Sequence, residues 1–140
     1  MNYSEVIKAV AQFIRITKQE PILIASCALV MHRLANVASD IDMVTTPKQD
    51  LVIHKTLLNG KQPDRFKGTG MRYYEVDVGD ITYDFGPYPD WLNEDQDVTR
   101  IMGIRVLKIE ALLAFYERFD PPRPKDAPRI AMLRKVLGVN

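Results

Sequence analysis

The sequence has a single cysteine, Cys27, so no disulfide can form within its 140 residues, and a zinc site built from cysteines is not expected. Long hydrophobic runs are also missing, because the longest apolar-rich stretch, Pro21 to Met31, falls far short of the roughly 20 residues that span a bilayer. The first residues lack the basic segment and apolar run of a secretory signal, and no repeat or low-complexity tract is visible. These absences predict a soluble cytoplasmic protein with no membrane partner.

The chain also carries little net charge. Its 19 Lys and Arg residues and 18 Asp and Glu residues give a formal charge of +1, which argues against a protein that coats nucleic acid through bulk positive charge. The charge is unevenly spread, since residues 75–97 hold eight acidic and no basic side chains and lie between two basic segments. The length and the 46% hydrophobic content predict a single domain over 1–140, with a core at about 21–86 and C-terminal helices at about 107–138.

Hydrophobic periodicity and capping residues predict a mixture of strands and helices, and hence an α/β or α+β class with a mixed sheet. The clearest signal is a β-hairpin, in which residues 73–78 and 81–85 alternate at period two about Gly79-Asp80. The other expected elements are a helix from a Ser4 cap to about Lys18, a strand at 22–25, a helix at 26–34, a strand at 41–45, a helix from a Thr46 cap to about Leu58, a strand near 104–107, and helices at about 109–119 and 126–137.

Two segments do not fit a regular element. Residues 60–70 are polar, carry Lys61, Arg65 and Lys67, and are expected to form a long loop that is mobile or functional. Residues 90–103 are ambiguous, and a loop with one helical turn that enters a short strand fits them.

Two carboxylates stand two residues apart at the start of the strand expected at 41–45. Period two directs the side chains of Asp40 and Asp42 to one face of the sheet, while Ile41 points to the other face and the core. Two like charges so close repel each other unless a cation neutralises them. Hard oxygen ligands at this spacing suit Mg²⁺.

A third carboxylate, Asp84, lies in the middle of a predicted strand, where aspartate is disfavoured. It shares a face with Thr82, and this placement suggests a third ligand for the same metal site. Asp80 belongs to the hairpin turn, where aspartate is ordinary. Asp77 on the preceding strand remains a rival to Asp84 for the third position.

Taken in order, these residues resemble the nucleotidyltransferase superfamily with the DNA polymerase β-like catalytic fold, most closely its small bacterial abortive-infection toxin and lincosamide nucleotidyltransferase members. The family pattern is a strand, Gly-[Gly/Ser], a short helix, Asp-x-Asp on the next strand and a third aspartate on a later strand. The resemblance covers about Pro21 to Leu137, and its matching stretches are 23–32, 39–44, 81–86 and the Arg-x-Lys-Asp segment at 123–126. It implies a mixed sheet with helices packed on one face and a C-terminal helical segment.

The resemblance implies a metal-dependent enzyme that moves a nucleoside monophosphate from ATP or another NTP to an acceptor hydroxyl and releases pyrophosphate. Asp40, Asp42 and Asp84 would be catalytic and would hold Mg²⁺ or Mn²⁺, in the manner of sites with two metals about 3.5–4 Å apart. Ala25, Ser26 and Lys125 would contact the nucleotide. The acceptor is a small molecule, a protein or an RNA, and a homodimer or a partner protein remains open.

The sequence departs from the family pattern at several positions. Ala25 stands where the family usually has glycine, a change that costs little unless the backbone there needs a positive φ. Tyr116 stands where a lysine is common, and Asn36 and Ala38 replace an arginine and a threonine. These departures favour an alternative function, a catalytically reduced binding or regulatory module of a toxin–antitoxin or phage system. A metal-dependent nuclease is a third, weaker option.

Other residues carry smaller expectations. His32 is expected to pack and to donate to a nearby carbonyl rather than to bind a ligand. Trp91 either packs beneath a loop or stacks on a base. Asp126 is expected to cap the last helix. The basic segments 61–67 and 123–125 are candidate triphosphate contacts that could steer a polyanion towards the carboxylates.

Overall fold

The computed structural model describes residues 1–69 and 71–139, and the side chains of these residues except 66–69 and 71–73. Within this part of the chain, one seven-stranded sheet has the order β3-β4-β5-β2-β1-β7-β6. The strands are β1 (Ile22–Leu23), β2 (Ile41–Thr45), β3 (Arg65–Thr69), β4 (Met71–Val78), β5 (Ile81–Pro87), β6 (Val98–Ile101) and β7 (Ile104–Leu107). The helices are α1 (Tyr3–Thr17), α2 (Ala25–Met31), α3 (Pro47–Thr56), α4 (Glu94–Asp97), α5 (Ile109–Glu117), the 3₁₀ turn η1 (Pro124–Asp126) and α6 (Ala127–Leu137).

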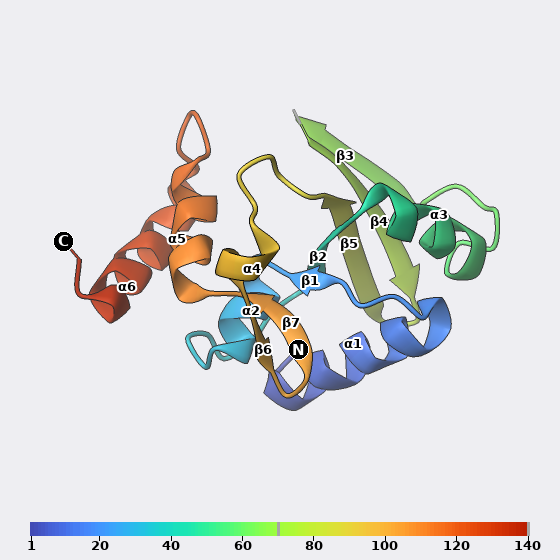
Figure 1. Ribbon diagram of the computed structural model, residues 1–140, viewed down its shortest axis with the longest axis horizontal. Helices are drawn as coiled ribbons and strands as arrows, with labels where there is room; N and C mark the ends of the chain where they lie inside the picture. The colour runs from blue at the N-terminus through green and yellow to red at the C-terminus, as the bar shows by residue number, and fades with distance from the viewer. Residues whose placement is uncertain (70, 140) are drawn as a thin grey trace.

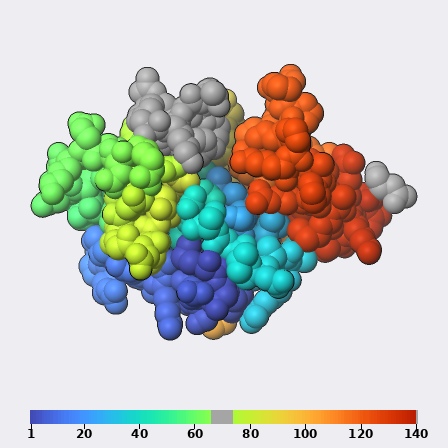
Figure 2. All heavy atoms as spheres, turned by 180° about the vertical axis from the view of Figure 1, so that it is seen from behind, coloured from blue at the N-terminus to red at the C-terminus, as the bar shows by residue number. Residues whose placement is uncertain are grey.

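The sheet is mixed. β2 pairs with β5 and β1 with β7 in parallel, whereas β1–β2, β3–β4, β4–β5 and β6–β7 are antiparallel. Figure 1 shows α1 running beneath the sheet, and α5 and α6 together at the end of the molecule away from α3. Seen from behind, α5 and α6 again form a block at one end (Figure 2). The predicted mixed fold with a C-terminal helical segment is confirmed. None of the described helices is long and apolar enough to cross a membrane.

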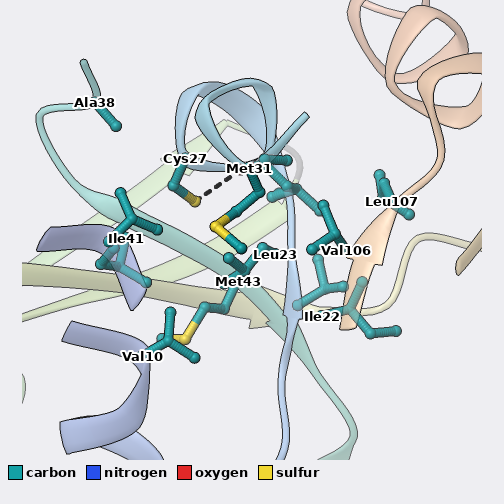
Figure 3. Close-up of a cluster of buried hydrophobic side chains, with 14 of the residues drawn as sticks. Val10, Ile22, Leu23, Cys27, Met31, Ala38, Ile41, Met43, Val106 and Leu107 are labelled. Atoms are coloured by element: carbon teal, nitrogen blue, oxygen red, sulfur yellow. Dashed lines mark hydrogen bonds between the residues drawn. The ribbon is translucent and has the colours of Figure 1, made fainter. Parts of the chain in front are cut away.

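Alternation along β2 and β5 separates the two faces of the sheet centre. Ile41, Met43, Tyr83 and Phe85 are fully buried, and the Tyr83 hydroxyl donates to the carbonyl of Ala9 on α1 at 2.6 Å. Figure 3 shows side chains from α1, α2 and the central strands meeting in one cluster that includes Val10, Met31 and Met43. Asp42 and Asp84 occupy the alternate positions, so period two directs them away from this packed face.

The helix starts show how local sequence sets the elements. Thr46 caps α3 and forms a capping box with Gln49, as predicted, although the helix ends at Thr56 rather than near Leu58. The prediction of Ser4 as the cap of the first helix is wrong. Asn2 accepts from the backbone N–H of Glu5 and completes a capping box with it, so the helix begins at Tyr3.

The prediction of a loop at 60–70 is also wrong in part, because residues 65–69 form the strand β3. This strand is an edge strand, antiparallel to β4, in the register Arg65↔Glu75 to Thr69↔Met71. Its polar, glycine-containing sequence has low intrinsic strand preference, and pairing with β4 overrides that preference. Lys67 has its side chain outside the described part of the chain.

The ambiguous segment at 90–103 contains a short helix, α4, and a strand, β6. β6 forms a hairpin with β7, in the register Val98↔Leu107 to Ile101↔Ile104. The predicted helical turn and the strand near 104–107 are therefore present, and the sequence missed β6. The positive φ of both Met102 and Gly103 fits the tight connection of this hairpin.

Candidate active site

The parallel pairing of β2 and β5 places the carboxylates of Asp42 and Asp84 side by side, since these two residues are register partners. Asp40 comes immediately before β2. One carboxylate oxygen from each of Asp40, Asp42 and Asp84 lies within 4.8 Å of the other two. Asp84 is 7% exposed, and the other two are half-buried. We call these three residues the aspartate triad.

The triad has the chemistry of a divalent metal site. Three carboxylates with oxygens within 4.8 Å of one another concentrate negative charge at the edge of a core, where it is poorly screened. They present only hard oxygen donors, which Mg²⁺ and Mn²⁺ prefer, and Mg²⁺ in proteins is commonly held by one or two carboxylates together with substrate phosphates. The residues present therefore fit a divalent cation.

Asp77, the rival for the third position, lies outside the triad. Its carboxylate accepts hydrogen bonds from both terminal nitrogens of Arg65, at 2.6 and 3.0 Å, and from the hydroxyl of Thr82 at 2.8 Å. The hydrogen bonds from Arg65, followed by the one from Thr82, hold the pKa of Asp77 below its usual value. Asp77 thus belongs to a surface ion-pair network.

Glu75 is an acidic residue beside the triad that sequence reasoning missed. It is the register partner of Asp84 on β4, is 3% exposed, and pairs with the Nε of Arg65 at 2.5 Å. The hairpin alternation contained the signal, because pairing about Gly79-Asp80 sets residue 75 opposite residue 84. Arg65, offered as a triphosphate contact, is instead engaged by Glu75 and Asp77.

The start of α2 is tied to the backbone of Asp42. The N–H of Ile24 donates to the Asp42 carbonyl at 3.0 Å, and the N–H of Asp42 donates to the sulfur of Cys27 at 3.3 Å. The Cys27 thiol in turn donates to the carbonyl of Ile24 at 3.1 Å. Ala25 and Ser26, the predicted nucleotide contacts, are therefore held next to the triad strand.

Ala25 has a φ of 57°, in the left-handed region that favours glycine. Alanine is expected to cost little at this position unless the backbone needs a positive φ. The backbone does have a positive φ there, so replacing the family's usual glycine by alanine carries a cost. A left-handed alanine costs about 1–2 kcal/mol, and such strain tends to collect at functional sites.

Cys27 itself is an internal packing residue. Its side chain is free and fully buried, and burial raises the pKa of the thiol far above its usual range. A neutral thiol of this kind is a poor nucleophile and a weak hydrogen-bonding group. Its contribution here is to join α2 to β2.

The C-terminal basic segment is organised by a buried carboxylate. Asp126 is fully buried, accepts from the Nε of Arg123 at 2.5 Å, and has a terminal nitrogen of Arg129 at 3.7 Å. The prediction that Asp126 caps the last helix is wrong, because its side chain makes no capping hydrogen bond and is held by these two arginines. Lys125 is exposed.

Tyr116 on α5 lies near one of these two arginines, Arg129. Its side chain is 2% exposed, and the guanidinium carbon of Arg129 lies 5.5 Å from its ring centroid. Burial, and then the charges of Asp126 and Asp42, raise the pKa of Tyr116 to about 12, while the charge of Arg129 opposes that rise.

Two further expectations concern packing. His32 places its Nε2 2.7 Å from the carbonyl of Leu107, which confirms a structural histidine that donates to the backbone. Trp91 lines a small apolar pocket together with Val44 and Phe115, and the guanidinium carbon of Arg118 lies 4.8 Å from its ring centroid. The packing interpretation of Trp91 therefore has direct support.

No family model matches the chain, and no curated protein does. Solved structures are similar at low identity. A candidate nucleotidyltransferase from Thermotoga maritima is 16% identical, with a TM-score of 0.65 over 97% of this chain and 92% of that chain. ANT(2″)-Ia, an antibiotic-resistance factor solved with adenylyl-2″-tobramycin, is 16% identical, with a TM-score of 0.61 over 96% of this chain and 90% of that chain.

These neighbours show that the chain has the nucleotidyltransferase fold, as the resemblance predicted. The closer likeness to abortive-infection toxins and lincosamide enzymes stays a prediction.

Proposed function

We propose that this protein is a metal-dependent nucleotidyltransferase, which moves a nucleoside monophosphate from an NTP to an acceptor hydroxyl and releases pyrophosphate. The observation that carries this proposal is the aspartate triad, three carboxylates within 4.8 Å of one another in a chain with this fold. Asp42 and Asp84 are register partners on β2 and β5, and Asp40 comes immediately before β2. The neighbour ANT(2″)-Ia was solved with an adenylylated product, which supports the same class of transfer.

Each residue of the proposed site has a separate part. Asp40 and Asp42 would hold the divalent cation that accompanies the triphosphate, and Asp84 would share in that set. A bound metal would neutralise the negative charge of the phosphates while the pyrophosphate is displaced. The hydroxyl of Ser26, the backbone of Ala25 and the ammonium of Lys125 are the proposed contacts to phosphate oxygens.

The proposed reaction is a displacement at the α-phosphorus. The acceptor oxygen forms a new bond to the α-phosphorus. At the same time, the bond breaks between the α-phosphorus and the oxygen that bridges the α- and β-phosphorus atoms. Pyrophosphate leaves with that electron pair, and the carboxylate of Asp84 takes the proton of the acceptor hydroxyl. The buried position of Asp84 beside Asp42 supports this assignment, because a base must sit at the reacting centre rather than in solvent.

The intact triad is the reason to prefer an enzyme over a catalytically reduced binding module. A chain that had lost catalysis would have no need to keep three mutually repulsive carboxylates within 4.8 Å. No observation of the described residues favours the nuclease alternative over transfer.

The test is transfer of label from each of the four NTPs, labelled at the α-phosphate, in the presence of Mg²⁺ or Mn²⁺. Small-molecule, protein and RNA fractions of a cell extract serve as separate acceptor pools. We expect label in one pool, and a loss of about 100-fold or more in Asp84→Asn, as for removal of a general base. Asp80→Asn, which removes an exposed turn carboxylate on the same hairpin, is the matched control and keeps full transfer. Equal transfer by Asp84→Asn would contradict the proposal.

A further inference from the structure

A row of charged residues crosses the face of the sheet that carries the triad. It runs over the neighbouring strands β3, β4, β5 and β2, and the register pairs Arg65 with Glu75, Glu75 with Asp84, and Asp84 with Asp42. Register partners point to the same face of a sheet, and neighbouring strands lie about 4.8 Å apart. Glu75 therefore lies directly beside the aspartate triad, and Arg65 lies one strand further away.

Glu75 and Asp84 place two carboxylates opposite each other in a position that water reaches poorly. Glu75 is 3% exposed and Asp84 is 7% exposed, and like charges directly opposite in an antiparallel pair destabilise a sheet. Arg65 counteracts this repulsion, because its Nε lies 2.5 Å from a carboxylate oxygen of Glu75. The ion pair thus adds one negative and one positive charge to the surroundings of the triad.

Asp77 fixes the arginine in this place. The two terminal nitrogens of Arg65 donate to the Asp77 carboxylate, and its Nε donates to Glu75, so two carboxylates on β4 hold all three nitrogens of the guanidinium. Charge-assisted hydrogen bonds of this kind are strong and directional. They keep the positive charge of Arg65 at a defined place beside the triad.

The two charges act in opposite directions on a cation held by the triad. The negative charge of Glu75 attracts the cation, whereas the positive charge of Arg65 repels it, and both interactions strengthen where solvent screens poorly. With both residues present, the two effects largely cancel. Removal of either charge alone leaves the effect of the other unopposed.

We propose that the Arg65–Glu75 ion pair sets the affinity of the aspartate triad for its divalent cation, with Glu75 raising the affinity and Arg65 lowering it. The proposal rests on the proposed function only in taking the triad to bind such a cation. Both are positioning residues, which act on the triad through their charges without contact to the metal or the nucleotide. Arg65 thereby has a role other than the triphosphate contact expected from the sequence.

The experiment measures free Mn²⁺ by electron paramagnetic resonance as protein is added without nucleotide, and unfolding of the metal-free protein by denaturant. In Arg65→Gln the charge of Glu75 is unopposed by Arg65, so we expect Mn²⁺ to bind about tenfold more tightly and the free energy of unfolding to fall. In Glu75→Gln we expect Mn²⁺ to bind about tenfold more weakly. The double variant removes both charges and should bind Mn²⁺ like the parent protein.

Arg134 provides a matched control for the loss of one positive charge. It pairs with Glu117 at 2.5 Å, its side chain is 43% exposed against 47% for Arg65, and it lies on α6, at the other end of the molecule from β3 (Figure 1). Arg134→Gln should leave the Mn²⁺ affinity unchanged. Arg65→Lys keeps the positive charge but loses the planar fork, so it should lower the free energy of unfolding and bind Mn²⁺ like the parent protein.

The direction of the change separates a charge effect from a merely structural role. An arginine that only held the sheet edge in place would, when replaced, lower both the free energy of unfolding and the Mn²⁺ affinity. Equal or weaker Mn²⁺ binding by Arg65→Gln, or equal or tighter binding by Glu75→Gln, would overturn the proposal. If Arg65→Gln does not fold, Glu75→Gln decides alone. A parent protein that binds no Mn²⁺ would remove the proposed function as well, which distinguishes the two failures.

Discussion

The two faces of β2 and β5 carry different side chains, apolar ones packed in the core on one face and carboxylates on the other. On one face, Tyr83 and Phe85 are fully buried under the helices, and even the Tyr83 hydroxyl is paired. On the other face, one residue away in each strand, Asp42 and Asp84 bring carboxylates together at the triad. The packed face contributes apolar burial to stability, whereas the acidic face places like charges close together, which costs stability unless a cation neutralises them.

This contrast shows how the fold separates stability from chemistry with a period of two. The parallel register fixes Asp42 opposite Asp84 only because Ile41, Met43 and their β5 partners are locked in the core. A slip by one residue would exchange the two faces, burying the carboxylates and exposing the apolar side chains. The packing of the core therefore sets the relative position of Asp42 and Asp84.

The largest effect is expected from breaking the packed face. Phe85 is fully buried, and its ring centroid lies 5.4 Å from that of Tyr74 and 6.4 Å from that of His54. Phe85→Ala should lower the free energy of unfolding by about 3–5 kcal/mol, measured by denaturant unfolding. The milder Phe85→Leu should retain the fold and bind divalent metal like the parent protein. A small loss of stability in Phe85→Ala would show that this face is not the core.

Cys27 belongs to the buried core and is also hydrogen-bonded to the strand that carries Asp42. Its sulfur accepts from the backbone N–H of Asp42. Cys27→Ala should cost about 1–2 kcal/mol of unfolding free energy through lost packing and weak hydrogen bonds. Since burial raises the pKa of the thiol, it should react with iodoacetamide only when the protein unfolds. Mass spectrometry of the native and the denatured protein after labelling tests this. Rapid labelling of the native protein would contradict the buried position.

The smallest stability change is expected at the rim of the acidic face. Ala25 has a φ of 57°, so Ala25→Gly should raise the free energy of unfolding by about 1 kcal/mol. Ala28→Gly, in the interior of the same short helix, is the control and should lower it by about 1 kcal/mol. If both substitutions destabilise the protein equally, the strain assigned to Ala25 is absent.

The sequence was informative where a signal is local. Period two placed Asp84 on the face away from Tyr83, and Thr46, Pro47 and Gln49 marked the start of α3. The Asp-x-Asp spacing identified the first two members of the triad, because a period of two directs residues 40 and 42 to the same side, although Asp40 lies just before β2.

Predictions from the sequence failed where the structure of a segment depends on partners that are distant in the chain. β3 forms because β4 offers a free edge, and Arg65 pairs with Glu75 ten residues away, so neither could be read from a polar, glycine-containing segment. Asp126 stands at a position typical of a helix cap, yet Arg123 and Arg129 hold its carboxylate instead. The positive φ of Ala25 depends on how α2 meets β2, which only the packed structure specifies.

The central claim is that the acidic face is a divalent metal site built by strand register, and Mn²⁺ binding tests it most directly. Electron paramagnetic resonance measures free Mn²⁺ as protein is added in the presence of a non-hydrolysable NTP. We predict that the parent protein and Asp80→Asn bind Mn²⁺, and that Asp42→Asn and Asp84→Asn bind it at least about tenfold more weakly while remaining folded. Equal Mn²⁺ binding by all four proteins would contradict the account.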